Sequence, residues 1–164
     1  MNHRFDGDPT IRTALPADLE QMLTLADDRR REYSKYQPIF WHPAPDAISL
    51  QRSYFEGLIA EESVITLVEV SGGKLLGFVI ANLVQAPTVY EPGGLTCSVD
   101  DFAVAKPGAW ATTGVALLER VKQEAQQRGA VQLVVVCGHL DEAKRSVLAD
   151  CQMSVASEWW VASL

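Results

Sequence analysis

Residues 99–121 constrain the fold of this chain most strongly, because they predict a strand that runs into a helix through a short loop. The strand ends in Asp101-Phe-Ala-Val104, the loop holds small residues, and Gly114 lies at the start of an amphipathic helix. Free backbone N–H groups at such a helix N-terminus suit a phosphate or pyrophosphate. Residues 131–137 predict a second buried strand. The site therefore lies inside a β-α-β unit, where α/β proteins usually bind ligands.

The preceding residues predict an antiparallel hairpin. Two runs rich in β-branched residues are joined by Ser71-Gly-Gly-Lys74, a strong hairpin signal. With one helix opened by Pro16 and another capped by Asp46, the element order is β-α-α-β-β-β-α-β-α-β. The predicted fold class is α/β with a mixed sheet, antiparallel in its first half and with a parallel crossover around the central helix. The expected strands are 11–15, 63–70, 75–84, 95–104, 131–137 and 155–164, and the later helices are 113–128 and one capped by Asp141.

Composition narrows the class of protein. A length of 164 residues suits one domain, which we expect over 11–164 after a polar tail at 1–10. A net charge of −7 argues against nucleic acid or an anionic membrane as the partner. The three cysteines are odd in number, and the N-terminus has no apolar run, so free thiols and a cytoplasmic location are expected. The histidines and cysteines have no zinc spacing, so no metal is expected.

Residues 99–121 and the element order resemble the GNAT superfamily of acyl-CoA-dependent N-acyltransferases, over most of the chain from Ile11 to Leu164. Asp101-Phe-Ala-Val104 matches the end of the family's coenzyme-binding strand, and Val115-Ala-Leu-Leu-Glu119 matches the start of the following helix. The resemblance implies acetyl-CoA as co-substrate, with its pantetheine paired along the strand like an added strand. It assigns coenzyme binding to Phe102, Ala103, Val104, Ala109, Trp110, Ala111, Thr112, Thr113 and Gly114.

The loop departs from the family pattern. Ala109 stands where the family has Arg or Gln, and Thr112 stands at the first glycine, whereas Gly114 fits. Loss of the basic side chain removes a charge-assisted contact worth about 1–3 kcal/mol, but several backbone donors remain. Leu148 stands where the family's Tyr protonates the departing thiolate. Cys151 or solvent would have to replace that Tyr, although Cys151 also suits a buried core position.

Acyl transfer to an amine also needs a base. Asp100 is the first candidate and Ser98 the second, because alternation along the strand allows only one of Asp100 and Asp101 to face the cleft. Asp100 equally suits a solvated or structural carboxylate. Aromatic and proline residues over 33–45 predict a rigid loop that interrupts the helix and covers the acceptor amine, or that simply packs on the sheet. The acceptor residues named from this loop are Tyr33, Tyr36, Trp41 and His42.

Three functions follow from these patterns. The first is an N-acetyltransferase that moves the acetyl group of acetyl-CoA to a primary amine of a small molecule or peptide, by direct attack in a ternary complex. The second is a non-catalytic protein of the same fold, either an acyl-CoA sensor or a protein-interaction module. Trp110 suits both, since it could stack on adenine, cover the phosphates or fill the coenzyme's space. The third, a nucleotide-binding protein of another β-α-β fold, is opposed by the early hairpin. Trp159 and Trp160 leave a homodimer possible, because one of them faces outward on a strand.

Overall fold

One five-stranded mixed sheet organises the molecule, seen in a computed structural model that describes residues 7–164. The strands lie in chain order, every neighbouring pair is antiparallel except the last, and β4 and β5 are parallel. The predicted fold class is confirmed. The strands are β1 (Thr10–Thr13), β2 (Ile65–Ser71), β3 (Lys74–Val84), β4 (Leu95–Val104) and β5 (Ala130–Val135).

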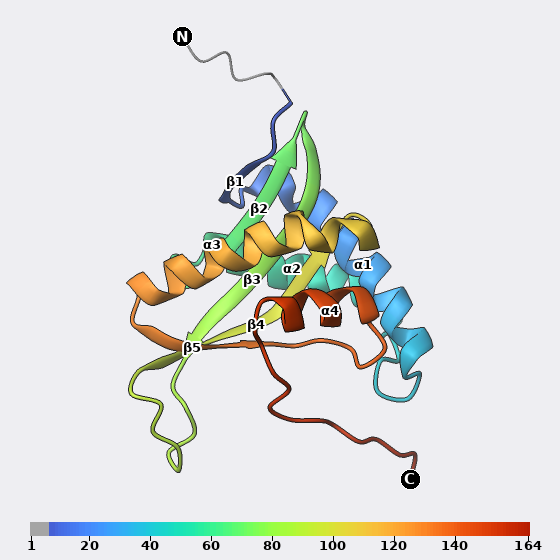
Figure 1. Ribbon diagram of the computed structural model, residues 1–164. Coiled ribbons are helices and arrows are strands. Elements are labelled where there is room, and N and C mark those ends of the chain that lie inside the picture. The colour runs from blue at the N-terminus through green and yellow to red at the C-terminus, as the bar shows by residue number, and fades with distance from the viewer. Residues whose placement is uncertain (1–6) are drawn as a thin grey trace.

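Helices cover both faces of the sheet. The short helix η1 (Pro16–Asp18) leads into α1 (Leu19–Tyr36), and α2 (Ala47–Ala60) packs with α1 on one face. A second short helix, η2 (Pro107–Ala111), leads into α3 (Thr113–Gln127), which crosses the other face as Figure 1 shows. The last helix, α4 (Glu142–Asp150), packs beside α3 and η2. No helix among residues 7–164 has the length and apolar content needed to cross a membrane.

Local turn chemistry explains the hairpin between β2 and β3. Gly72 and Gly73 have φ values of +54° and +76°, the left-handed region that a two-residue hairpin turn requires at both positions. Gly129, with φ +91°, ends α3 in the same region, as predicted for its C-terminal cap. The Asp141 carboxylate accepts a hydrogen bond from the Lys144 N–H at 3.2 Å and so caps α4, also as predicted.

One expected strand and one expected helix end are wrong, and the other strand ends differ from the expected ones by at most two residues. The final strand over 155–164 does not form, because within residues 7–164 no strand pairs with this segment and supplies the ladder that an extended segment needs. Trp159 and Trp160 stay exposed there. Helix α1 also does not break at Tyr33 but continues to Tyr36, and it ends before Pro38, whose ring disfavours helix in the residue ahead of it. The expected tail at 1–10 falls mostly outside the described residues, and Thr10 already belongs to β1.

Candidate functional site

Strand β4 carries a β-bulge at Asp100, the residue predicted to act as a base. Val99 and Asp101 pair with consecutive residues of β3, so Asp100 has no partner across that ladder. The Asp100 side chain is exposed, and its Oδ1 accepts a long hydrogen bond, 3.4 Å, from Ser98 Oγ. Because of the extra residue, Val99 and Phe102 pack in the same core although they are three positions apart. The bulge thus interrupts the simple alternation on which the sequence prediction relied.

Arg29 of α1 holds this bulge through two hydrogen bonds. Its guanidinium donates to the backbone oxygen of Asp100 at 3.2 Å and to Asp101 Oδ1 at 2.9 Å. Burial raises the pKa of the Asp101 carboxyl above its usual value, and the positive charge of Arg29 opposes that rise. Sequence reasoning missed Arg29. Arg29 lies seven residues after Met22 and three after Ala26, both of which are buried, and this spacing puts it on the same face of the helix.

Strands β4 and β5 separate just beyond the bulge. The last backbone hydrogen bond between them joins Val136 N–H to Val99 O at 3.0 Å. Strand β4 then continues to Val104, whereas the chain after Val136 turns away toward α4. In the described part of the chain, residues 100–104 therefore have one edge without a β5 partner. Phe102, Ala103 and Val104, the residues assigned to coenzyme binding, all lie on this free edge.

The loop expected to bind pyrophosphate is itself helical. Pro107 opens η2 at the first helical position, a placement that its fixed φ favours. Ala109 and Ala111 are part of η2, and Thr112 follows as an exposed residue at the N-terminus of α3. The first hydrogen bond of α3 joins Ala116 N–H to Thr112 O at 2.9 Å. The N–H groups of residues 113–115 precede it and have no acceptor within the helix.

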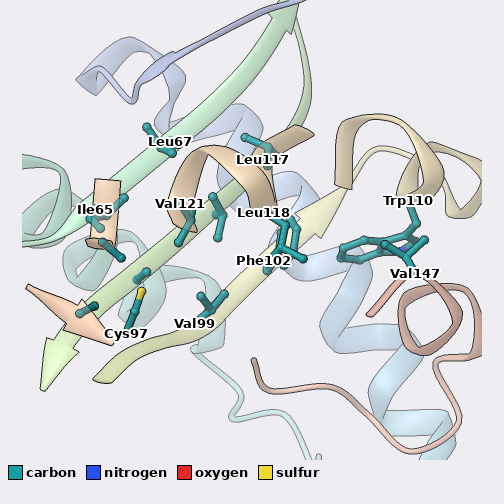
Figure 2. Close-up of a cluster of buried hydrophobic side chains, with 14 residues drawn as sticks. Ile65, Leu67, Cys97, Val99, Phe102, Trp110, Leu117, Leu118, Val121 and Val147 are labelled. Atoms are coloured by element: carbon teal, nitrogen blue, oxygen red, sulfur yellow. The ribbon is translucent and has the colours of Figure 1, made fainter. Parts of the chain in front are cut away.

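Trp110 is buried against the start of α3 rather than exposed in the loop. A Cβ built on Gly114 would lie 2.6 Å from Trp110 Cε3, so only glycine allows this contact. The indole also packs edge-on against Phe102, with ring centroids 4.8 Å apart, and lies in the core drawn in Figure 2. A similar close approach occurs at Gly77 of β3, where a Cβ would lie 2.7 Å from Thr113 Cγ2. Gly77 therefore allows the first turn of α3 to lie close to the sheet, and Gly114 allows that turn to lie close to the Trp110 ring.

Lys144 of α4 is the main residue that sequence reasoning missed. Its side chain is fully buried, and Nζ donates a hydrogen bond to Val136 O at 2.8 Å, where β4 and β5 separate. Burial lowers the pKa of Lys144 to about 8. The signal was present in the sequence, because Lys144, Val147, Leu148 and Cys151 follow the i, i+3, i+4, i+7 spacing of one helix face.

The acceptor residues predicted over 33–45 lie in different environments. Tyr33 is buried, and its hydroxyl donates to Asp141 Oδ2 at 2.9 Å and accepts from Gly138 N–H at 3.0 Å. The rings of Tyr36 and Trp41 lie 5.5 and 5.2 Å from the Tyr33 ring. His42 is exposed. The structure therefore brings three of the four residues into one aromatic cluster.

Known proteins were compared with this chain by sequence and by structure. No family profile and no curated protein matches the sequence. Among solved structures, a predicted acetyltransferase from Clostridium acetobutylicum with acetyl-CoA has a TM-score of 0.73 at 14% identity, covering 95% of this chain and 96% of the other. A mutant protein from Bacillus halodurans has a TM-score of 0.81 at 17% identity, covering 94% and 99%.

A further similar structure carries the family designation in its own name. A GCN5-related N-acetyltransferase from Ralstonia eutropha has a TM-score of 0.70 at 18% identity, covering 95% of this chain and 99% of the other. At this identity the similarity concerns the fold, and it extends over the same sheet, loop and central helix from which the resemblance was inferred. That resemblance is confirmed at this level: the chain has the fold of the GNAT acetyltransferases.

Proposed function

We propose that this protein is an N-acetyltransferase that moves an acetyl group from acetyl-CoA to a primary amine of a small molecule or peptide. One observation carries the proposal: the free edge of β4 over residues 100–104 runs directly into η2 and the N-terminus of α3. An unpartnered strand edge can pair with the amides of pantetheine, and unsatisfied N–H groups at a helix N-terminus can bind a diphosphate. Both parts belong to one continuous stretch of chain, as a single coenzyme requires.

The residues present fit acetyl-CoA through backbone groups more than through side chains. Phe102, Ala103 and Val104 provide the strand edge. Thr113 and Gly114 carry the first N–H groups of α3, and both residues are buried, so a diphosphate would reach these groups only from the side of η2 and Thr112. Lys106 is the one basic residue between Val99 and Arg120 in the sequence, and it is exposed at the start of η2. Burial of Trp110 means that its indole would not stack on adenine without first leaving the core.

The exposed carboxylate of Asp100 supports its role as the base. A bulge turns one residue out of the ladder and is a common way to aim a side chain at an active site. Asp100 would accept the proton of the attacking amine directly or through water, with Ser98 as its neighbour at 3.4 Å. The amine would attack the thioester within a ternary complex, and a backbone N–H of the β4 edge would polarise the carbonyl.

Titration calorimetry with acetyl-CoA, with free CoA as control, tests the coenzyme site. We expect a dissociation constant on the order of micromolar, which corresponds to about −8 kcal/mol. Asp100→Asn should then lower the rate of transfer mainly at low pH, where removing a proton from the amine limits the reaction. Asp28→Asn on α1, which changes another exposed aspartate away from β4, is the control. A normal rate in Asp100→Asn at every pH would exclude the role of base.

The alternative function is a non-catalytic acyl-CoA sensor or interaction module of the same fold. Packing of Trp110 over Gly114 favours it, because this contact covers the start of α3. The titration and the transfer assay together separate the alternatives. Binding without transfer to any amine supports a sensor, and no binding at millimolar acetyl-CoA supports an interaction module. A homodimer and a cytoplasmic location remain predictions, and the exposed Trp160 agrees with a partner subunit. Sedimentation equilibrium measures the oligomeric state directly.

A further inference from the structure

The Lys144 ammonium group lies between the two strands that separate. Its Nζ is 2.8 Å from Val136 O, on the residue that follows β5. It also lies 5.3 Å from the ring centroids of Phe102, on the free edge of β4, and of Trp110, in η2. Figure 2 shows the Trp110 ring reaching from Phe102 toward Val147, on the turn of α4 that follows Lys144. Strand edge, loop and last helix thus meet at this nitrogen.

The surroundings of Lys144 are not those of a structural ion pair. An ammonium group has three N–H donors, yet within residues 7–164 its one hydrogen bond goes to the Val136 backbone oxygen. No carboxylate lies within salt-bridge distance of it in the same residues. A buried lysine kept for stability is normally paired, because an unpaired buried charge is costly. Aromatic faces offset part of that cost while leaving the proton free to move.

Burial and nearby charges together set the pKa of Lys144. Burial is the main cause that lowers its pKa to about 8, and Arg29 lowers it further, whereas the acidic groups nearby raise it. An acid with a pKa near the working pH gives up its proton readily in a reaction. The titratable and charged side chains around it are Arg29 and Tyr33 of α1, Asp101 of β4, and Cys137 and Asp141 of the segment before α4.

We propose that Lys144 is the proton donor to the departing thiolate, an inference that rests on the acetyl transfer proposed above. Lys144 lies one helical turn before Leu148 on the same face of α4, and Leu148 has no proton to give. Since the ammonium group is beside the free edge of β4, a thioester bound along that edge would bring its sulfur toward Nζ.

The proposed step balances as follows. The amine nitrogen forms a bond to the acetyl carbon, and the carbon–sulfur bond breaks with its electron pair on sulfur. A proton moves from Lys144 Nζ to sulfur and yields the free thiol. The proton of the attacking amine moves to the Asp100 carboxylate. After the products leave, Asp100 releases this proton to solvent and Lys144 takes up a proton from solvent, which restores both groups. No oxidant, reductant or further reactant is needed.

Steady-state acetyl transfer by the full-length protein, followed from about pH 6 to about pH 10, tests this role. Lys144→Met keeps the length of the side chain and removes the proton. We expect kcat to fall on the order of 100-fold, the usual effect of losing a general acid. The wild-type kcat should also decrease above about pH 8, as Lys144 loses its proton, and this decrease should be absent in Lys144→Met. Lys122→Met, which changes a lysine on the surface of α3, should leave both features unchanged.

Three results would overturn the inference, and they can be told apart. Wild-type transfer with an unchanged kcat and pH profile in Lys144→Met overturns the role of Lys144 alone. If Lys144→Met does not fold, Lys144→Arg gives the same test, because arginine keeps the charge but does not release its proton; a wild-type rate in that variant overturns the role. Absence of transfer by the wild-type protein to every amine tested overturns the proposed function and this inference with it.

Discussion

The Tyr33 hydroxyl of α1 donates a hydrogen bond to the Asp141 carboxylate at 2.9 Å and so connects the end of the first long helix to the start of the last one. The other oxygen of Asp141 caps α4 through the Lys144 N–H at 3.2 Å. The same Tyr33 hydroxyl accepts from Gly138 N–H at 3.0 Å. One buried tyrosine therefore sets the direction in which α4 leaves β5, and with it the place of Lys144.

Tyr33→Phe should destabilise the protein. The change leaves the buried Gly138 N–H without its acceptor and removes a donor from Asp141, and such losses cost about 1–3 kcal/mol. Urea unfolding followed by circular dichroism measures this difference. Tyr36→Phe, on the same helix but half-buried, is the control and should change the free energy of unfolding by less than about 0.5 kcal/mol. Equal midpoints for the two variants would contradict the prediction.

The buried Lys144 should make stability rise with pH. Its pKa falls from 10.5 in the ordinary lysine to about 8 in the fold, so between these values the unfolded chain binds more protons than the native one. Each pH unit corresponds to about 1.4 kcal/mol, which makes the total change ~3 kcal/mol. We expect the free energy of unfolding of the wild type to increase relative to that of Lys144→Met from about pH 8 to about pH 10.5.

Unfolding of both proteins in urea across this range measures that difference. Comparison of the two proteins removes the effect of Cys97, whose pKa burial raises and which acts in the opposite direction. Cys137 does not cancel in the same way, because the charge of Lys144 lowers its pKa. A constant difference between wild type and Lys144→Met at all pH values would show that Lys144 is not buried as an ammonium group.

Gly114→Ala should separate α3 from the indole that covers its first turn. The new methyl group would lie 2.6 Å from Trp110 Cε3, so the ring must move, at a cost of about 1–3 kcal/mol. Gly108→Ala in η2 is the control, because no atom lies within 4 Å of its added Cβ. Thermal unfolding measures the loss of stability, and Trp fluorescence reports the movement of the ring. If Gly114→Ala leaves both as they are in the wild type, the contact between Trp110 and Gly114 is not as described.

Arg29→Met should weaken the protein in a pH-dependent way. The Asp101 carboxylate, with a side chain 13% exposed, would lose its cation, and loss of one partner of a buried pair costs about 3 kcal/mol. The defect should shrink as pH falls through the raised pKa of Asp101, because protonation removes the unpaired charge. Lys35→Met, which breaks an exposed pair with Glu32, should cost less than about 1 kcal/mol at any pH. A defect that does not change with pH would exclude Asp101 as its cause.

Several predictions that rested on local signals were confirmed, although Asp46 precedes α2 without the predicted side-chain cap hydrogen bond. Two glycines at the tip of the hairpin, Asp141 at the start of α4 and Gly129 after α3 each act within a few residues of their own position. Strand β4 has the bounds expected for it, since its β-branched and apolar run has turn residues on both sides. The parallel crossover between β4 and β5 follows from the helix that connects them.

Predictions that needed a distant partner were the ones that failed or were missed. Residues 155–164 have the composition of a strand, but no strand in the described part of the chain pairs with them. Trp110 looked like a loop residue available to a ligand, and contact with Phe102 and Gly114 buries it instead. The bulge at Asp100 depends on the register between β3 and β4, which no single strand specifies.

The sequence by itself determined the order of the elements, the hairpin and the strand-loop-helix unit, because hydrophobic period, caps and glycine turns act over a few neighbouring residues. Only the tertiary structure decided that Lys144 meets Val136, Phe102 and Trp110 at the point where β4 and β5 separate. That meeting joins four segments far apart in the chain. The protonation of Lys144 is likewise set by the packing of those segments, since burial, and not the residue type, brings its pKa to about 8.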